Sequence, residues 1–282
     1  MNKLMLLGVV VVAACSPDNR GLEKKLDDLT KKVDTLLQQG GRAGAAAPRA
    51  QRNEPDRAKV YAVPIEGDLI DGPADAKITL VKAYDYACPY CEKVRPTMED
   101  LRKKYGNDLR IVFKQFVVHP ATATAPALAV CAAGKQGKFL QMDALLWDKG
   151  FKARAFDKDA AAAEAGGQSQ KCWESAAGCP IVLGFAQELG LNADKFKADM
   201  KECVPQIQRD QRELQALSVS ATPSFFVNGR FLAGAMPTEN FVTLIDEELK
   251  KANEKIQAGT PAASYYQQVV LDKGLKTVER AQ

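Results

Sequence analysis

The sequence has few of the side chains from which metal sites are built. It contains one histidine, His119, in 282 residues, and one Cys-x-x-Cys motif, from Cys88 to Cys91. A structural zinc site needs four ligands, commonly two cysteine pairs or one pair with two histidines. The single pair leaves zinc as a minor alternative, and we predict that the protein uses neither a metal ion nor another cofactor.

The chain also lacks a large excess of charge of either sign. It has 39 Lys and Arg against 35 Asp and Glu, a formal net charge of +4. Nucleic-acid-binding domains concentrate basic residues on one surface, whereas short basic runs such as residues 102–104 are typical of solvated helix faces. We therefore predict no nucleic-acid partner.

The apolar run at the N-terminus is too short to span a bilayer. It extends from Leu4 to Val12, whereas a membrane-spanning helix needs about 20 residues. Lys3 precedes this run and small residues follow it, which is the pattern of an export signal. We therefore expect residues 1–14 to be a signal peptide.

The end of this signal carries a cysteine. The stretch Val12-Ala13-Ala14-Cys15 resembles a bacterial lipobox, and this resemblance implies that Cys15 becomes the lipidated first residue of a protein anchored to a membrane. Ser16 rather than aspartate follows, which favours the periplasmic side of the outer membrane under the better-known sorting rule. The alternative is an ordinary secretory signal in which Cys15 is incidental. Both export the chain to an oxidising compartment, where disulfides persist.

Residues 15–39 combine the anchor with a short amphipathic helix. Apolar residues at spacings of four and three form a heptad seam through residues 22–36. They are Leu22, Leu26, Leu29, Val33 and Leu36. The seam lasts about two and a half repeats, so it fits either a small coiled coil that makes a homo-oligomer or a spacer above the lipid. Residues 40–59 are rich in Gly, Ala, Arg and Pro, which predicts a flexible linker.

The Cys-x-x-Cys motif lies between an apolar run, residues 78–84, and a segment of helical spacing, residues 94–105. Pro89 suits the first helical position, so Cys88 falls at the N-cap, where unpaired N–H groups and the helix dipole stabilise a thiolate. We expect the pKa of Cys88 to lie below its ordinary value of about 8.5. Cys91, one turn further on, can close a disulfide with it. The pair therefore predicts a redox dithiol, with an inert structural disulfide as the alternative.

The rest of the chain mixes strand and helix signals, which predicts an α/β fold. The expected elements are strands at residues 60–65, 78–84 and 109–118, a turn at 67–73, several helices within 121–217, a hairpin about Asn228-Gly229 and a helix at 238–253. Strand, helix and strand in this order imply two parallel strands joined by a right-handed crossover. The tail, residues 257–282, includes a short helical segment at 264–271 without an evident role.

Four further cysteines lie in the helical region. Their number is even and the expected compartment is oxidising, so we predict two structural disulfides. Of the three pairings, we favour Cys172 with Cys179 and Cys131 with Cys203. Free buried cysteines are the alternative.

Two separated motifs together resemble the DsbA-type thioredoxin-fold thiol:disulfide oxidoreductases. They are Asp85-Tyr86-Ala87-Cys88-Pro89-Tyr90-Cys91 and Thr222-Pro223-Ser224-Phe225-Phe226-Val227-Asn228-Gly229, with Phe113-Lys114-Gln115-Phe116 and His119-Pro120 between them. The resemblance covers about residues 60–253. It implies a thioredoxin-fold domain at residues 60–256 with an inserted helical domain at about 121–217.

Carried over residue by residue, the resemblance makes Cys88 the nucleophile and Cys91 the resolving thiol. Pro223 would be a cis-proline that faces them. Thr222 would supply backbone groups that pair with an extended client peptide, which Pro89 and Tyr90 would also contact.

Two residues near the motif depart from the family or are ambiguous. Many relatives have a glutamate six residues before the first cysteine, where this chain has Lys82. A buried cation would favour the Cys88 thiolate, but we expect Lys82 to extend its amine to solvent. His119 would either modulate the site or be structural, and we expect the second.

The direction of the reaction depends on a reduction potential that the sequence does not determine. Pro89-Tyr90 between the cysteines, with Thr222 before the proline, resembles the DsbG and ScsC isomerase-type members, so oxidase and isomerase stay open. Either needs cysteine-containing exported clients and a membrane redox partner. The alternatives from other classes are a tethered peptide-binding or chaperone module without turnover, and a glutathione-dependent glutaredoxin-like domain.

Overall fold

The computed structural model describes residues 24–25, 28–32, 54–157 and 171–278, and the chain divides into two compact units, 1–52 and 53–282. In the first unit the described residues are helical, and Leu29 of the expected seam is 61% exposed. The signal segment, Cys15 and the other seam residues lie outside the described residues. The lipid anchor and the coiled coil therefore stay predictions.

The second unit is built on a mixed five-stranded sheet. Its strands are β1 (Leu69–Asp71), β2 (Ile78–Tyr84), β3 (Leu109–Gln115), β4 (Ser224–Val227) and β5 (Arg230–Ala233), in the order β1-β3-β2-β4-β5. The central strands β2 and β3 are parallel, as predicted, and the other neighbours are antiparallel. Both central strands are buried along their whole length, which agrees with the mainly apolar stretches at residues 78–81 and 111–113.

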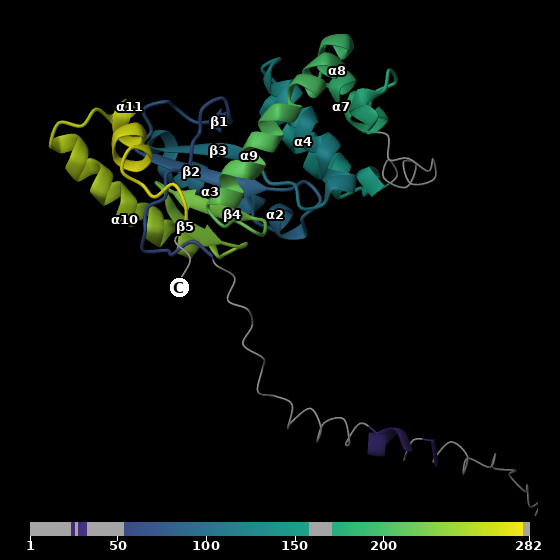
Figure 1. Cartoon of the computed structure of the whole chain (residues 1–282), viewed down its shortest axis with the longest axis horizontal. Helices are drawn as coiled ribbons and strands as arrows, with labels where there is room; N and C mark the ends of the chain where they lie inside the picture. Colours follow the sequence, from purple (N-terminus) through teal and green to yellow (C-terminus); the bar gives the residue numbers. More distant parts are fainter. Residues whose placement is uncertain (1–23, 26–27, 33–53, 158–170, 279–282) are drawn as a thin grey trace, which may run out of the picture. The chain divides into compact units, whose positions relative to one another are not determined.

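The helices fall into three groups along the chain. They are α2 (Pro89–Lys93), α3 (Arg95–Tyr105) and the 3₁₀ turn η1 (Gly106–Asp108) after β2; α4 (Pro120–Gly134), α5 (Phe139–Leu145), η2 (Leu146–Phe151), η3 (Cys172–Glu174), α7 (Pro180–Glu188), α8 (Ala193–Glu202) and α9 (Val204–Ala216) in the insert; and α10 (Thr238–Gln257), α11 (Ala262–Tyr265) and η4 (Tyr266–Leu271) after β5. Figure 1 shows α4, α7 and α8 grouped at one end of the sheet, α10 and α11 at the other, and α9 returning from the insert to the strands.

Helices cover both faces of the sheet. One apolar cluster joins Leu80 of β2 to α3, α10 and the insert, and it includes both cysteines of the motif. A second cluster joins Val81 of β2 to Leu214 of α9 on the opposite face. Adjacent residues of β2 thus point to opposite layers, as alternation along a strand requires. The fold is the predicted α/β thioredoxin arrangement with an inserted helical domain.

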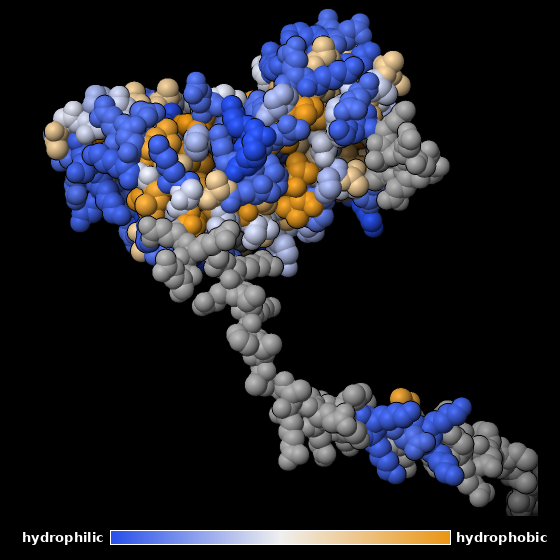
Figure 2. Space-filling model, viewed as in Figure 1, coloured by the Kyte–Doolittle hydropathy of each residue, from blue (hydrophilic) through white to orange (hydrophobic). Residues whose placement is uncertain are grey.

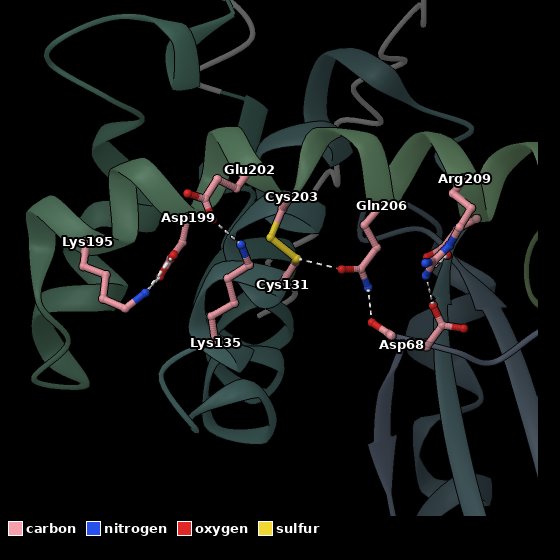
Figure 3. Close-up of a disulfide and its surroundings, with 11 residues drawn as sticks. Asp68, Cys131, Lys135, Lys195, Asp199, Glu202, Cys203, Gln206 and Arg209 are labelled. Carbon is pink, nitrogen blue, oxygen red and sulfur yellow. Dashed lines mark hydrogen bonds and ion pairs between the residues drawn. A yellow bond between two sulfur atoms is a disulfide. The ribbon is translucent and has the colours of Figure 1, made fainter.

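The insert contains both disulfides that we expected, Cys131–Cys203 and Cys172–Cys179. Figure 3 shows the first of them joining α4 to the residue between α8 and α9. The side-chain oxygen of Gln206 lies 3.4 Å from Cys131 Sγ, and its amide nitrogen donates to the carbonyl oxygen of Gly67 at 3.0 Å. The disulfide therefore lies where α9 begins to contact the segment before β1.

A buried ionic cluster holds α9 on the sheet. Lys114 of β3 is fully buried and lies 2.7 Å from Asp68, 2.7 Å from Glu213 and 3.2 Å from Asp210. Arg209 binds Asp68 from its outer side at 2.8 Å (Figure 3). Because three carboxylates surround one ammonium, removal of that ammonium would leave them with only the partly exposed Arg209 as a counter-ion.

The start of the domain differs from our expectation. Residues 60–65 form no strand, only isolated bridges at Val60 and Tyr61, because Pro64 lacks an N–H for a ladder. Instead β1 lies in the segment that we expected to be a turn, and Ile70 pairs with Val112 of β3. The linker also ends earlier than expected, since residues 54–59 belong to the domain: the backbone N–H of Asp56, for example, donates to the Tyr61 hydroxyl at 2.8 Å.

Three other boundaries also differ from our expectation. β3 ends at Gln115 rather than residue 118, because the N–H of Val118 donates to the side chain of Asp85 instead of to a strand. The helix after the motif is divided at Val94 by Pro96, which has no N–H for the helical ladder. The tail is part of the domain, since the Tyr266 hydroxyl donates to the carbonyl oxygen of Val63 at 2.9 Å.

The surface of the domain is mostly hydrophilic on the face in Figure 2, where apolar patches lie on either side of the exposed surface of α9. Among the described residues, no helix combines the length and apolar character needed to cross a membrane.

Candidate active site

The site begins where β2 gives way to α2. Cys88 has an extended backbone (φ −88°, ψ 116°) and is the N-cap of α2, with Pro89 as the first helical residue, as predicted. The backbone N–H of Cys91 donates to the Cys88 carbonyl oxygen at 3.1 Å, so the second cysteine lies one turn along the helix. Both thiols are free, and only 4% of Cys88 and 3% of Cys91 are exposed. Tyr90 between them is 62% exposed.

A segment far along the chain, Thr222 and Pro223, contacts Cys88. The Thr222–Pro223 peptide bond is cis, as the resemblance implied. The Cys88 thiol donates to the carbonyl oxygen of Thr222, with Sγ at 3.4 Å. Pro223 directly precedes β4, which pairs with β2, so the central sheet itself brings these distant residues together.

The environment separates the acidities of the two thiols. Hydrogen bonds from the Cys91 thiol, then from the Thr222 side chain and the backbone of residues 90 and 91, lower the pKa of Cys88 to about 6 against the opposing effect of burial. Burial first, and then the hydrogen bond to Cys88, raise the pKa of Cys91 far above its ordinary range. At neutral pH the reduced pair therefore carries one thiolate, on Cys88, and one thiol, on Cys91.

Asp85 ties the dithiol segment to the start of the insert. Its carboxylate is fully buried and accepts hydrogen bonds from the backbone N–H groups of Ala87 at 2.6 Å, Val118 at 2.6 Å and His119 at 2.8 Å. Nδ1 of His119 lies 3.3 Å from the same carboxylate, and that residue is the N-cap of α4. Asp85 therefore fixes the position of the loop that carries Cys88 relative to α4.

Lys82 lies beneath the site and does not reach solvent, so our expectation for this residue was wrong. It is 6% exposed, and its Nζ lies 4.2 Å from the ring centroids of both Tyr84 and Phe113. A strand that is buried on both faces gives a long side chain no outward path. Burial is the largest influence on Lys82 and lowers its pKa.

A polar chain that the sequence did not indicate links this layer to the insert. The Tyr84 and Tyr86 hydroxyls lie 3.1 Å apart, Tyr86 donates to Asp143 of α5 at 2.7 Å, and Gln115 donates to Tyr84 at 2.5 Å. Asp85, Tyr86 and Gln115 lie within the motifs that carry the family resemblance, although no role was assigned to them from the sequence. An aspartate directly after a strand is in addition typical of side-chain caps and turns. Asp143 lies far along the chain in a helix, where no local pattern marks it.

The predicted site residues thus divide into two sets. The structure brings Cys88, Cys91, Thr222 and Pro223 together, with Lys82 below them, whereas the two disulfides belong to the insert. Within the described part of the chain, no group of three or more His, Cys, Asp or Glu is arranged to hold a metal ion.

Comparison with known proteins identifies the family. A thioredoxin family model matches residues 65–247, and the chain therefore belongs to the thioredoxin family. Among curated proteins it is 29% identical over 205 residues to the Na(+)/H(+) antiporter NhaA of Herminiimonas arsenicoxydans, covering 71% of this chain and 29% of that protein. It is 33% identical over 176 residues to NhaA 1 of Salinispora arenicola, covering 60% of this chain and 23% of that protein. The chain spans less than a third of the length of these curated relatives.

A solved structure with a similar fold is alpha-DsbA1 of Wolbachia pipientis, at a TM-score of 0.53 and 17% identity, covering 69% of this chain and 96% of that one. This likeness concerns the fold, a thioredoxin sheet with inserted helices of the DsbA type.

Proposed function

We propose that the protein is an exported, membrane-tethered thiol:disulfide oxidoreductase that forms or reshuffles disulfides in client proteins through Cys88 and Cys91. This proposal rests on the difference between the two thiols. Cys88, at the N-terminus of α2, has a pKa of about 6 and is a thiolate at neutral pH, whereas Cys91 beside it stays protonated. Structural cysteine pairs have no need of such a difference.

The chemistry balances over the two sulfurs. In the oxidative direction a client thiolate attacks Cys88 Sγ, the Cys88–Cys91 bond breaks, and Cys91 leaves with the electron pair and takes a proton. A second client thiolate then attacks the client sulfur of the mixed disulfide and displaces Cys88. The low pKa of Cys88 makes it a good leaving group, because a less basic thiolate leaves faster. The client loses two electrons and the pair gains them.

The cis-proline segment offers a place for the client. The Thr222 carbonyl oxygen lies 3.4 Å from Cys88 Sγ, so an extended peptide that paired with this backbone would hold its own sulfur close to Cys88. Tyr90, exposed on the outer side of α2, would contact the same peptide. Pro89 would shape the first turn below it.

The tether is proposed from the sequence alone. Lipid on Cys15, an amphipathic segment at residues 22–36 and a linker to about residue 53 would hold the domain beside a membrane, with a membrane redox partner renewing the active form. Mass spectrometry of the mature N-terminus tests this part. A lipidated Cys15 is expected, and an unmodified residue released from the membrane fraction would contradict it.

Two substrates separate the candidate activities. The disulfide form is incubated with a reduced, unfolded protein, and the dithiol form with the same protein carrying scrambled disulfides. Oxidation of the first identifies an oxidase, and recovery of the second identifies an isomerase. Cys88→Ser should abolish both activities, whereas Cys131→Ala with Cys203→Ala should keep them if the variant folds. Client binding without either reaction would refute the proposal in favour of a peptide-binding module.

A further inference from the structure

A buried lysine lies on the face of β2 whose apolar cluster includes the reactive pair. Lys82 is the fifth residue of β2 and packs between the rings of Tyr84 and Phe113, with Nζ 4.2 Å from each ring centroid. It has no ion-pair partner within the described residues. A desolvated cation–π contact contributes about 2 kcal/mol, whereas burying an ammonium costs several kcal/mol. The rings alone therefore do not hold the proton on this amine.

The charges around Lys82 come from three elements. Alternation along β2 places Lys82 on the same face as Leu80 and Tyr84, whose apolar cluster includes both cysteines. Burial is the largest influence and opposes the ammonium. Asp143 of α5 and, after it, Cys91 of α2 favour the ammonium, and the guanidinium groups of Arg102 and Arg95 in α3 oppose it.

Of the two groups that favour the ammonium, only the sulfur changes with the redox state. In the reduced protein the pair carries one negative charge, on Cys88, whose thiolate accepts a hydrogen bond from the neighbouring Cys91 thiol. In the disulfide that charge is gone. The half-buried Asp143 and both α3 guanidinium groups remain as they are.

We infer that Lys82 is a redox-linked proton site, which holds its proton while the dithiol is reduced and releases it when the disulfide forms. This inference rests on the proposed function of the same pair. The reduced state is Cys88 thiolate, Cys91 thiol and Lys82 ammonium, and the oxidised state is the disulfide with Lys82 amine. Two electrons leave to a client or glutathione disulfide, and two protons leave, one from Cys91 and one from Lys82. Lys82 is thus a positioning residue that acts on the sulfurs through its charge.

If Lys82 only filled space and kept the same protonation state in both redox forms, oxidation of the protein would release one proton fewer. Each proton that accompanies a two-electron exchange changes the equilibrium constant of that exchange about tenfold per pH unit. Glutathione disulfide takes up two protons when it is reduced below the pKa of the glutathione thiol, so it provides a reference for the number of protons that the protein releases. If Lys82 releases its proton, oxidation of the protein releases as many protons as reduction of glutathione disulfide takes up. The equilibrium constant is then independent of pH. Without that release the oxidised protein is disfavoured about tenfold for each unit that the pH rises above the pKa of Cys88.

The first experiment measures the titration of Lys82 in the wild-type chain. The full chain carrying ¹³C-labelled lysine is titrated by NMR, once reduced with dithiothreitol and once oxidised with diamide, and the Lys82 Cε signal is assigned from Lys82→Arg. We expect Lys82 to titrate at lower pH in the oxidised form. Equal titration midpoints in the two forms would overturn the inference, whether or not the protein has oxidoreductase activity.

The second experiment measures the glutathione equilibrium at several pH values between the two Lys82 midpoints. Wild type should show a constant equilibrium. Lys82→Met should show a tenfold fall per pH unit, and Lys93→Met, which removes an exposed lysine on α2, should match wild type. An equal slope in wild type and Lys82→Met would refute the proton count. Failure of the wild-type pair to equilibrate would instead count against the proposed function, and the NMR titration would still decide the role of Lys82.

Discussion

The reactivity of Cys88 toward an alkylating reagent should follow an acidic titration curve, and Cys91 should control it. The hydrogen bond from Cys91 is the largest of the effects that lower the pKa of Cys88 to about 6. Replacing Cys91 by alanine removes this donor, so the pKa of Cys88 should rise. Cys91→Ser is the matched variant, because its hydroxyl can still donate to a thiolate.

The magnitude follows from the thiolate fraction. For a pKa of about 6 the fraction at pH 7.5 is about 10 times that at pH 5, whereas for an ordinary pKa of about 8.5 it is about 300 times. The ratio of rates at the two pH values thus differs about 30-fold between the two cases. Because both rates come from one sulfur, the limited access to Cys88 and its intrinsic nucleophilicity cancel.

The assay is iodoacetamide labelling of the reduced protein, followed by mass spectrometry of the peptide that contains the motif. Wild type should give the small ratio, Cys91→Ala a clearly larger one and Cys91→Ser a value between them. A wild-type ratio near that of an ordinary thiol would refute the reasoning. An unchanged ratio in Cys91→Ala would show that the neighbouring thiol is not the cause.

Three further outcomes test the same structure. The free energy of unfolding of the reduced form should rise by about 2 kcal/mol between pH 6 and pH 8. The pKa of Cys88 is lower in the folded than in the unfolded state, so the stabilisation from the Cys88 thiolate is lost as the pH falls toward 6. Denaturant unfolding should show this pH dependence in wild type and not in Cys88→Ser. Cys131→Ala with Cys203→Ala should lose about 2–4 kcal/mol in thermal or denaturant unfolding, since the bond closes a long loop, and an unchanged midpoint would contradict this. Lys114→Met should cost about 3–5 kcal/mol, because the buried carboxylates of Asp68 and Asp210 would keep only the partly exposed Arg209 as a counter-ion. Equal stability would show that these carboxylates take up protons at little cost.

The features predicted correctly from the sequence are those with a local physical cause. Pro89 after Cys88 determines where α2 begins, whatever surrounds it. Asn228 and Gly229 have positive φ values of 43° and 83°, which a tight hairpin requires and which these residue types tolerate. The mainly apolar stretches at residues 78–81 and 111–113 likewise identified the two central strands.

The features that were wrong or missed depend on contacts between distant segments. The buried state of Lys82 follows from helices packing on that face of β2, which no local pattern indicates. Asp143 reaches Tyr86 only because α5 packs near the start of α2. The short strand β1 lies where the sequence predicts a turn, because its three residues pair only after β3 provides an edge.

The central claim is that Cys88 and Cys91 form a redox pair in which one sulfur is a thiolate. The most direct test is to equilibrate the protein with defined mixtures of reduced and oxidised glutathione at pH 7 and to quantify both forms after acid quenching. The account predicts a reversible, two-electron transition between the dithiol and an intramolecular disulfide of Cys88 with Cys91, reached from either direction. A pair that stays in one form across the whole range of mixtures, or that exchanges only through Cys131 and Cys203, would contradict it.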